Sequence, residues 1–232
     1  MTKVLMIVSA ADHWTLNDGT LHPTGFWAEE LATPYSIFTD AGWDVDVATP
    51  GGKAPVVDKA SLDESAGDPD TLAAVKAKLD ELAPVLAKPL NLADVKAADY
   101  DLVFYPGGQG PMEDLAVDET SGRILAERME NNAPVALLCH APAAVLATEN
   151  APGSSPFAGR KMTGFSNDEE RATSLADKAP WLLEDRLVAL GAEYDKAPEP
   201  WASHVIVDGN LYTGQNPSSS KELAERLVKD LA

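Results

Sequence analysis

Short apolar runs alternate with amphipathic segments along most of this 232-residue chain. The apolar runs predict strands at residues 3–9, 44–48, 101–105, 134–138 and 161–165, and a hairpin at 204–213 around an Asp-Gly-Asn turn. Helical spacing predicts helices at residues 25–41, 121–131, 141–148, 181–190 and 222–231. The first helix is expected to be interrupted near Pro34 and to end at Gly42, and residues 10–24 are expected to be a long loop.

This order of elements predicts the fold class. Because strands and helices alternate, we expect an α/β protein with a doubly wound, mostly parallel sheet and helices on both faces. Residues 50–97 differ in character, with Pro-Gly turns, many acidic residues and an alanine-rich helix at about 71–83. We interpret the chain as one domain over residues 1–232, with a small insertion at about 50–97.

Charge and termini narrow the classes of partner. The formal net charge of -19 repels phosphate backbones and anionic lipid surfaces, so neither nucleic acid nor a membrane is an expected partner. The apolar run near the amino terminus is too short for a signal peptide, and no later run approaches the length of a membrane span. A single cysteine fits a reducing compartment, and a cytoplasmic location is expected.

That cysteine, Cys139, stands where a predicted buried strand ends. His140 follows it, and Pro142 lies near the first turn of the next predicted helix. Open α/β sheets bind ligands outside the carboxyl ends of their strands, and a helix N-terminus offers unpaired amide donors to an anion. The position is therefore that of a nucleophile, although a lone cysteine after an apolar strand is also often a small buried hydrophobic residue.

A glycine-rich turn follows another predicted core strand. In Tyr105-Pro-Gly-Gly-Gln-Gly110 the adjacent glycines Gly107 and Gly108 allow backbone amides to approach a ligand closely, as in an oxyanion hole. The glycine spacing is neither that of the dinucleotide-binding fingerprint nor that of a phosphate-binding P-loop.

An activated thiol needs more help than a helix end supplies. Lowering the pKa of a thiol from about 8.5 to about 5 or 6 requires about 3 to 5 kcal/mol, whereas a helix terminus supplies about 0.3 to 1 kcal/mol. An ionised carboxylate would oppose the thiolate, but a protonated carboxyl group donates a hydrogen bond to it. We therefore expect a buried glutamate beside Cys139.

Several motifs, in this order and spacing, resemble the DJ-1/PfpI superfamily and its Hsp31-like branch, which includes glutathione-independent glyoxalases. They are residues 24–31 (TGFWAEEL), Pro34, 41–42 (AG), 105–108 (YPGG), 139–143 (CHAPA), 163–165 (TGF), 201–205 (WASHV), 208–210 (DGN) and 213–217 (TGQNP). The resemblance covers nearly the whole chain. It implies a flavodoxin-like fold, also described as class I glutamine amidotransferase-like.

The resemblance also implies roles for particular residues. The family's nucleophile and its neighbouring histidine match Cys139 and His140, and the glutamate that bonds the cysteine sulfur matches Glu30. Glu29 is the competing choice, but one residue along a helix rotates the side chain by about 100°. The acid that orients the histidine matches Glu170.

Some assignments stay open at this stage. Glu169 and Asp168 are alternatives to Glu170, and a solvated helix start accounts for any of the three. Many Hsp31-like proteins carry a histidine and then an aromatic residue where this chain has Gln109 and Glu113, so the substrate preference stays open.

The implied activity is the conversion of a small 2-oxoaldehyde such as methylglyoxal to a 2-hydroxy acid, through a hemithioacetal on Cys139. The implied mechanism requires no metal or organic cofactor. Asp12, His13 and His22 lie in one predicted loop, but their spacing matches no strong zinc pattern. A homodimer is expected from the resemblance alone. Protein deglycase, peptidase and stress-chaperone activities are the alternatives.

Two further expectations concern His204 and the tryptophans. Glutamine amidotransferases place a glutamate two residues after a late histidine, whereas Ile206 stands there after His204, so that activity is not expected. Trp14, Trp27 and Trp201 are expected to pack in the core or to line a pocket.

Overall fold

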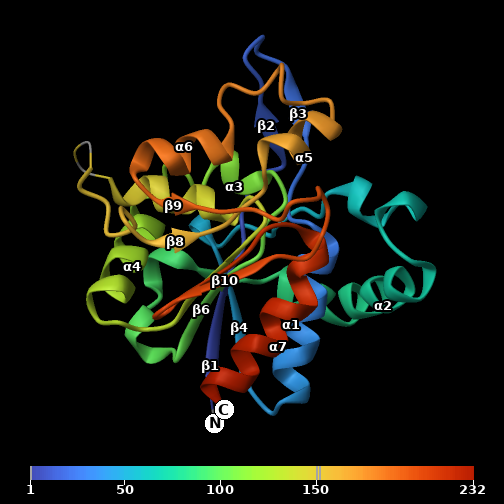
Figure 1. Ribbon diagram of the computed structural model, residues 1–232. Coiled ribbons are helices and arrows are strands. Elements are labelled where there is room, and N and C mark those ends of the chain that lie inside the picture. Colours follow the sequence, from blue (N-terminus) through green and yellow to red (C-terminus); the bar gives the residue numbers. More distant parts are fainter. Residues whose placement is uncertain (1, 150, 152) are drawn as a thin grey trace.

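The computed structural model describes residues 2–149, 151 and 153–232. Its centre is a seven-stranded sheet with the order β10-β11-β7-β6-β1-β4-β5 (Figure 1). All neighbours are parallel except the pair β10 and β11. The strands are β1 (Lys3–Ile7), β4 (Asp44–Thr49), β5 (Leu90–Asn91), β6 (Leu102–Tyr105), β7 (Val135–Leu138), β10 (Val205–Asp208) and β11 (Leu211–Gly214). The predicted fold class, a doubly wound and mostly parallel sheet, is confirmed.

Helices cover both faces of this sheet. On one face α1 (Ala28–Asp40) and α7 (Ser220–Leu231) lie side by side, and α2 (Pro69–Leu86) packs against α1 and extends outward (Figure 1). On the other face lie α4 (Glu119–Glu130), α6 (Leu183–Leu190) and the 3₁₀ helix η6 (Ala141–Thr148). The strands β6 and β7 are buried along their whole length, as apolar strands between two helical layers must be.

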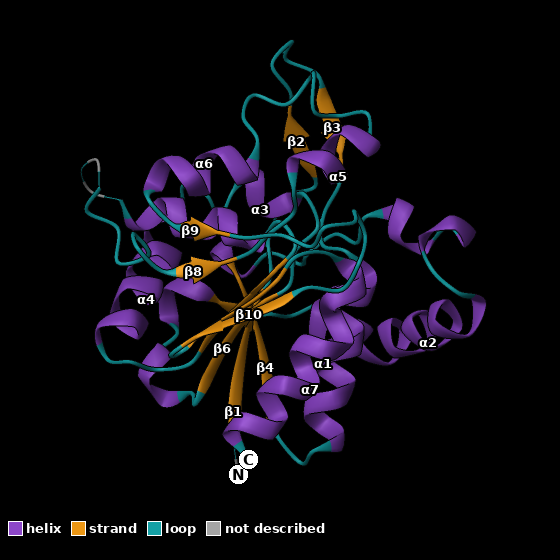
Figure 2. Ribbon diagram, viewed as in Figure 1, coloured by secondary structure: helices purple, strands orange, loops and turns teal. Residues whose placement is uncertain are grey.

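Short elements connect these layers. They are the helices α3 (Gly110–Glu113) and α5 (Asn167–Ala172), the strands β2 (His13–Thr15), β3 (Leu21–Pro23), β8 (Lys161–Met162) and β9 (Glu193–Tyr194), and the 3₁₀ turns η1 (Pro50–Gly52), η2 (Lys59–Leu62), η3 (Glu64–Ala66), η4 (Leu92–Asp94), η5 (Ala97–Asp99) and η7 (Pro217–Ser219). Figure 2 shows the loops gathered at the end of the sheet that faces the β2–β3 hairpin and α5. That end is the carboxyl edge of the parallel strands, where a binding crevice is expected.

Four local predictions were wrong. The helix at 25–41 is not interrupted: α1 continues through Pro34, whose buried side chain packs with the rest of that helix face and so compensates for one missing backbone hydrogen bond. Residues 10–24 are not one loop, because they contain the hairpin of β2 and β3. Residues 141–148 form a 3₁₀ helix, buried on nearly every side, instead of an α-helix. The strand predicted at 161–165 is only β8, which pairs with β9 in a separate small sheet.

The segment at residues 50–97 supplies α2 and the edge strand β5, which pairs with β4. Whether this segment is an insertion stays a prediction. Among the described residues, no helix is both long enough and apolar enough to cross a membrane.

Candidate active site

Cys139 occupies a strained turn directly after β7. Its φ is 61°, in the left-handed region that residues other than glycine rarely adopt. The turn is fixed on both sides, because the Cys139 amide donates to the Gly214 carbonyl at 2.9 Å and the Phe165 amide donates to the Cys139 carbonyl at 2.8 Å. Strain of this kind, held by surrounding hydrogen bonds, is typical of functional sites.

Glu30 lies beside this cysteine, in the first turn of α1, and is completely buried. Its Oε2 accepts a hydrogen bond from the Gly107 amide at 2.8 Å, and the carboxyl group and the Cys139 thiol influence each other's pKa. Its Oε1 has no hydrogen-bond partner among the described residues. Burial raises the pKa of Glu30 to about 8, so the group is a neutral acid at pH 7.

Opposing effects act on the thiol itself. Burial raises the pKa of Cys139 well above its usual value and an ionised Glu30 raises it further, against a smaller lowering effect of the Gly108 amide. Because Glu30 is neutral below about pH 8, its charge is absent at neutral pH and its O–H group is a donor. Burial is an opposing effect that the sequence analysis left out.

His140 lies on the other side of the sulfur and is oriented by Glu170. The His140 Nδ1 is 3.3 Å from Sγ of Cys139, and Nε2 is 2.7 Å from Oε2 of Glu170. Burial acts to raise the pKa of Glu170, but the charge and hydrogen bond of His140 outweigh it and the pKa lies below its usual value. The ionised Glu170 accepts a hydrogen bond from Nε2, and when the imidazole is neutral this leaves Nδ1 facing the sulfur as an acceptor.

Gln109 completes this side of the site. Its Nε2 donates to Oε1 of Glu170 at 2.9 Å, so the carboxylate is held at both oxygens. The sequence analysis noted Gln109 only as a departure from the Hsp31-like pattern. Gln109 is a polar residue beside the glycine-rich turn, which was the available signal in the sequence. Only the folded structure shows that its side-chain amide meets the Glu170 carboxylate.

The glycines explain how these groups fit together. A Cβ on Gly107 would lie 2.5 Å from the Leu138 carbonyl oxygen, 2.7 Å from Oε2 of Glu30 and 2.9 Å from Cβ of Cys139. Gly108 has a φ of 89° and directs its amide toward the sulfur. The Gly107 amide is bonded to Glu30, whereas the Gly108 amide acts on both the Cys139 thiol and the Glu30 carboxyl group.

The alternative acids occupy other environments. Glu29 borders a separate cavity of about 310 Å³ among α1, α2 and Lys221 of α7. Asp168 pairs with Lys196 and Arg171, both at 2.9 Å. The structure thus brings Glu30 and Glu170, rather than Glu29 and Asp168, to the cysteine and histidine.

Glu169 is completely buried but has a different set of contacts. It forms a capping box with Ser166. It also accepts hydrogen bonds from the Trp201 amide at 2.9 Å, from Gln215 Nε2 at 2.9 Å and from Asn216 Nδ2 at 2.8 Å. This carboxylate therefore joins three loops next to the site, a role that the sequence analysis did not identify.

A cavity of about 710 Å³ opens above the cysteine. The residues around the sulfur line one end of it: Cys139, His140, Gly108 and Gln109. The apolar walls are Trp27, Val56, Val57, Phe165, Leu175, Trp201 and Pro217. The rest of the lining consists of Asp12, His22, Pro23, Thr24, Asp58, Lys59, Ala60 and Thr173. Pockets of this size enclose ligands much larger than methylglyoxal.

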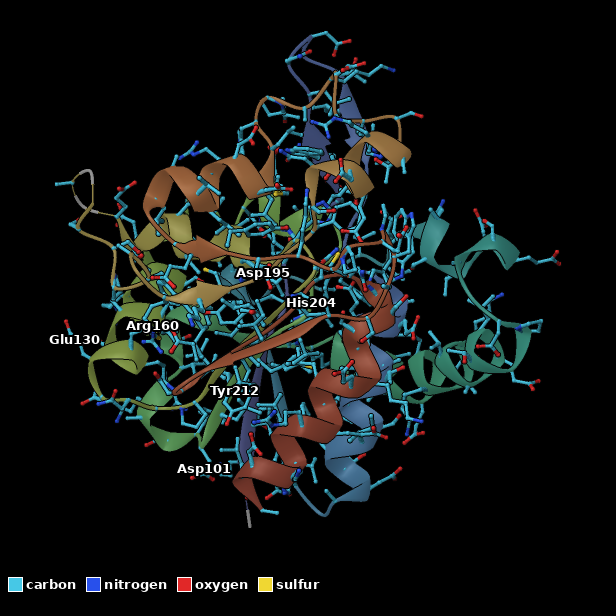
Figure 3. The ribbon with its side chains drawn as sticks, in the orientation of Figure 1. Asp101, Glu130, Arg160, Asp195, His204 and Tyr212 are labelled. Atoms are coloured by element: carbon cyan, nitrogen blue, oxygen red, sulfur yellow. The ribbon has the colours of Figure 1, made fainter. Side chains whose placement is uncertain are left out.

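Two other histidines lie away from the sulfur. His204, just before β10, has Nε2 3.3 Å from Oδ2 of Asp195, and Figure 3 shows the two residues next to each other. His13 contacts Asp12 at 2.6 Å and is 3.6 Å from Glu113, which also binds the Thr15 amide and hydroxyl. Within the part of the chain that is described, no three His, Cys, Asp or Glu side chains are arranged to hold a metal ion.

Comparison with known proteins gives one family. The sequence profile described as the DJ-1/PfpI family matches residues 21–230. The protein/nucleic acid deglycase HchA of Staphylococcus aureus (strain JH9) is 28% identical over an alignment of 240 residues, which covers 99% of this chain and 80% of that protein.

Solved structures agree over the full length. Rapid Encystment Protein 24 kDa of Francisella tularensis is 29% identical, with a TM-score of 0.87 and 100% of each chain covered. Glyoxalase III of Candida albicans, at 23% identity, has the same fold, with a TM-score of 0.79 over 98% of this chain and 96% of that one.

Proposed function

Because this chain belongs to the DJ-1/PfpI family, we propose that it is a glutathione-independent glyoxalase that converts methylglyoxal-type 2-oxoaldehydes to 2-hydroxy acids. The similarity to HchA along nearly the whole chain supports the Hsp31-like branch within that family. One observation carries the proposal: Cys139 sits between a neutral acid, Glu30, and a histidine whose free nitrogen faces the sulfur.

The first step forms a carbon–sulfur bond. His140 Nδ1 takes the thiol proton, and the resulting imidazolium is stabilised by the Glu170 carboxylate. The thiolate adds to the aldehyde carbon C1, whose oxygen becomes an alkoxide and takes a proton from Glu30. The Gly108 amide stabilises the negative charge on that oxygen.

The next steps move hydrogen from C1 to C2. The Glu30 carboxylate removes the C1 proton of the hemithioacetal while the C2 oxygen takes a proton from the His140 imidazolium, which gives an enediol. Glu30 then returns its proton to C2 and His140 takes the proton of the C1 hydroxyl group, which yields the thioester of the 2-hydroxy acid. Water then attacks the thioester carbonyl and Cys139 leaves as the thiolate. C1 is oxidised while C2 is reduced, so water is the only co-reactant and no external oxidant is needed.

The direct test is lactate formation from methylglyoxal without glutathione. The wild-type protein is expected to form lactate and Cys139→Ser to form none, with circular dichroism verifying that the variant is folded. Absence of lactate from protein with a reduced, unmodified Cys139 would remove the assignment.

A deglycase acting on methylglyoxal adducts of amino groups is the second candidate. The name of the HchA relative and the size of the cavity above Cys139 favour it. Release of lactate from a pre-formed adduct, in a mixture where a trap removes free methylglyoxal, supports the deglycase. If lactate forms only while free methylglyoxal is present, and stops when the trap is added, the result supports the glyoxalase.

The oligomeric state, the location in the cell and a chaperone activity also belong to this proposal. A homodimer is expected from the resemblance, and a cytoplasmic location from the single cysteine. A chaperone activity would not need the thiol, so client holding that survives Cys139→Ser would identify it as separate from the enzyme.

A further inference from the structure

The cavity is much larger than the simplest substrate requires. Methylglyoxal has five non-hydrogen atoms and occupies on the order of 150 Å³ at about 30 Å³ per atom, the share of a water molecule in the liquid. The cavity above Cys139 measures about 710 Å³. Most of it would therefore lie beyond the reacting carbons, next to whatever group the substrate carries on its ketone carbon.

A row of three rings leads from the reacting end toward the surface. The Phe165 ring stacks on His140 with centroids 4.2 Å apart, and Trp201 meets Phe165 edge to face at 5.5 Å. Exposure increases along this row, from 3% at His140 and 4% at Phe165 to 44% at Trp201. All three line the cavity, so a substituent that extends outward from Cys139 along this side contacts aromatic faces and edges.

Trp201 is held in this place against a conformational cost. Its φ is 67°, which is unfavourable for a bulky residue other than glycine. The Trp201 amide donates to the completely buried Glu169, which also fixes the side chains of Gln215 and Asn216. A strained backbone held by a buried carboxylate, with the indole left partly exposed at a cavity, indicates a binding surface rather than core packing.

The wall formed by residues 56 and 57 is also fixed. The Val56 carbonyl accepts from the Phe26 amide at 2.9 Å, and a Cβ on Gly25 would lie 1.9 Å from that oxygen. The polar group nearest in sequence, Asp58, is already bonded to Thr24 and to the Ala60 amide. The walls thus present apolar surface without rearrangement, which lowers the entropic cost of binding an apolar group.

We propose that Phe165 and Trp201 form the subsite for the ketone substituent, and that this enzyme prefers aryl-substituted 2-oxoaldehydes such as phenylglyoxal to methylglyoxal. The proposal rests on the glyoxalase function above and adds the substrate class. It makes Trp201 a specificity-determining residue that touches the substrate but not the reacting atoms.

The first experiment compares kcat/KM for phenylglyoxal and methylglyoxal. The wild-type ratio is expected to favour phenylglyoxal by about tenfold or more, the discrimination that a well-formed apolar pocket supplies. Trp201→Asn keeps a residue that tolerates the left-handed backbone but removes the indole. This variant should lose most of the preference, because its kcat/KM should fall much further for phenylglyoxal than for methylglyoxal.

Two control variants separate binding from folding. Trp201→Phe should retain most of the aryl preference, and Val188→Asn, at an exposed apolar side chain outside the cavity lining, should leave both rates unchanged. An equal loss for both aldehydes in Trp201→Asn, or a wild-type enzyme without aryl preference, would overturn the proposal.

A second experiment does not depend on turnover. The rates of alkylation of Cys139 by 2-bromoacetophenone and by bromoacetone are each divided by the rate for glutathione as a model thiol. The aryl reagent should be favoured by about tenfold in the wild type and not in Trp201→Asn. If neither aldehyde is converted, the glyoxalase function fails, but the ratio of the two alkylation rates still tests the subsite. An aryl preference no greater than that of glutathione rejects the subsite.

Discussion

At the scale of single residues, the site depends on a carboxyl group kept neutral by burial. Glu30 accepts a hydrogen bond from Gly107, but this does not compensate for its removal from water, and its pKa rises to about 8. The same burial that makes Glu30 a donor at pH 7 therefore costs folding stability as the pH increases.

Glu30→Gln tests this cost. The folded-state pKa lies above the unfolded value of 4.5, so the folded protein binds more protons between pH 4.5 and about 8 and loses stability as the pH rises through that window. Glutamine does not titrate, so the variant should become more stable than the parent by up to about 5 kcal/mol at pH 8 and by little at pH 5. Urea denaturation at both pH values, in a Cys139→Ser background that removes the thiol titration, measures the difference. An equal difference in the free energy of unfolding between variant and parent at both pH values would contradict the raised pKa of Glu30.

A substitution at Gly107 tests the close approach of Glu30 to Cys139. In Gly107→Ala the new Cβ overlaps the Leu138 carbonyl and separates Glu30 from Cys139, so lactate formation should fall by about 100-fold, because misplacement by about 1 Å has that effect on catalysis. Gly67→Ala is the matched control, since a Cβ there has no neighbour closer than 3.8 Å. Unchanged activity in Gly107→Ala would show that the close approach is not needed.

At the scale of elements, strand ends and helix starts assemble the site. β7 leads into Cys139, β6 leads into Gly107, and α1 begins two residues before Glu30. At the amino ends of the strands, opposite the site, the Arg128 side chain of α4 donates hydrogen bonds to four backbone carbonyls at 2.6 to 3.2 Å. They belong to Ala97, Tyr100, Asp101 and Pro134. These carbonyls precede β6 and β7, so one buried guanidinium positions the starts of both strands.

Arg128→Met should therefore destabilise the fold without changing the chemistry. Four carbonyls would lose a charged donor, and we expect a loss of about 3 kcal/mol or more in the free energy of unfolding. Arg123→Met, on the exposed side of the same helix, should stay within about 0.5 kcal/mol of the parent. The two variants are compared by urea denaturation. A loss below 1 kcal/mol in Arg128→Met would contradict this role.

Sequence patterns predicted the long elements better than the short ones. The buried strands and α4 and α7 stand out because each carries a full period of apolar residues, whereas β2, β3, β8 and β9 have only two or three residues and no measurable period. Motif spacing selected Glu30 and Glu170, but it gave no reason for the rings of Phe165 and Trp201 to meet. Such contacts join loops that are far apart in the chain, and only the packed fold defines them.

At the scale of the whole molecule, the excess of acidic residues is the dominant feature. The chain has 37 Asp and Glu against 18 Lys and Arg. Repulsion among like charges destabilises the compact state, and salt screens it over about 10 Å at 0.1 M.

Added sodium chloride should therefore stabilise this protein. From low salt to moderate salt we expect on the order of 1 kcal/mol, which is about 2–4 °C in melting temperature for a chain of this length. Differential scanning calorimetry at constant pH measures it. A melting temperature that falls with salt would show that attractive ion pairs such as Arg160–Asp208 outweigh the net repulsion.

The central claim is that the environment of Cys139, and Glu30 in particular, makes the thiol reactive near neutral pH. The most direct measurement is the rate of Cys139 alkylation by iodoacetamide as a function of pH, followed by mass spectrometry, in the wild type and in Glu30→Leu. The account predicts a wild-type midpoint near neutral pH and an upward shift of at least about one pH unit in the variant. A wild-type midpoint at or above about 8.5, the pKa of a free thiol, or no shift in Glu30→Leu, would contradict it.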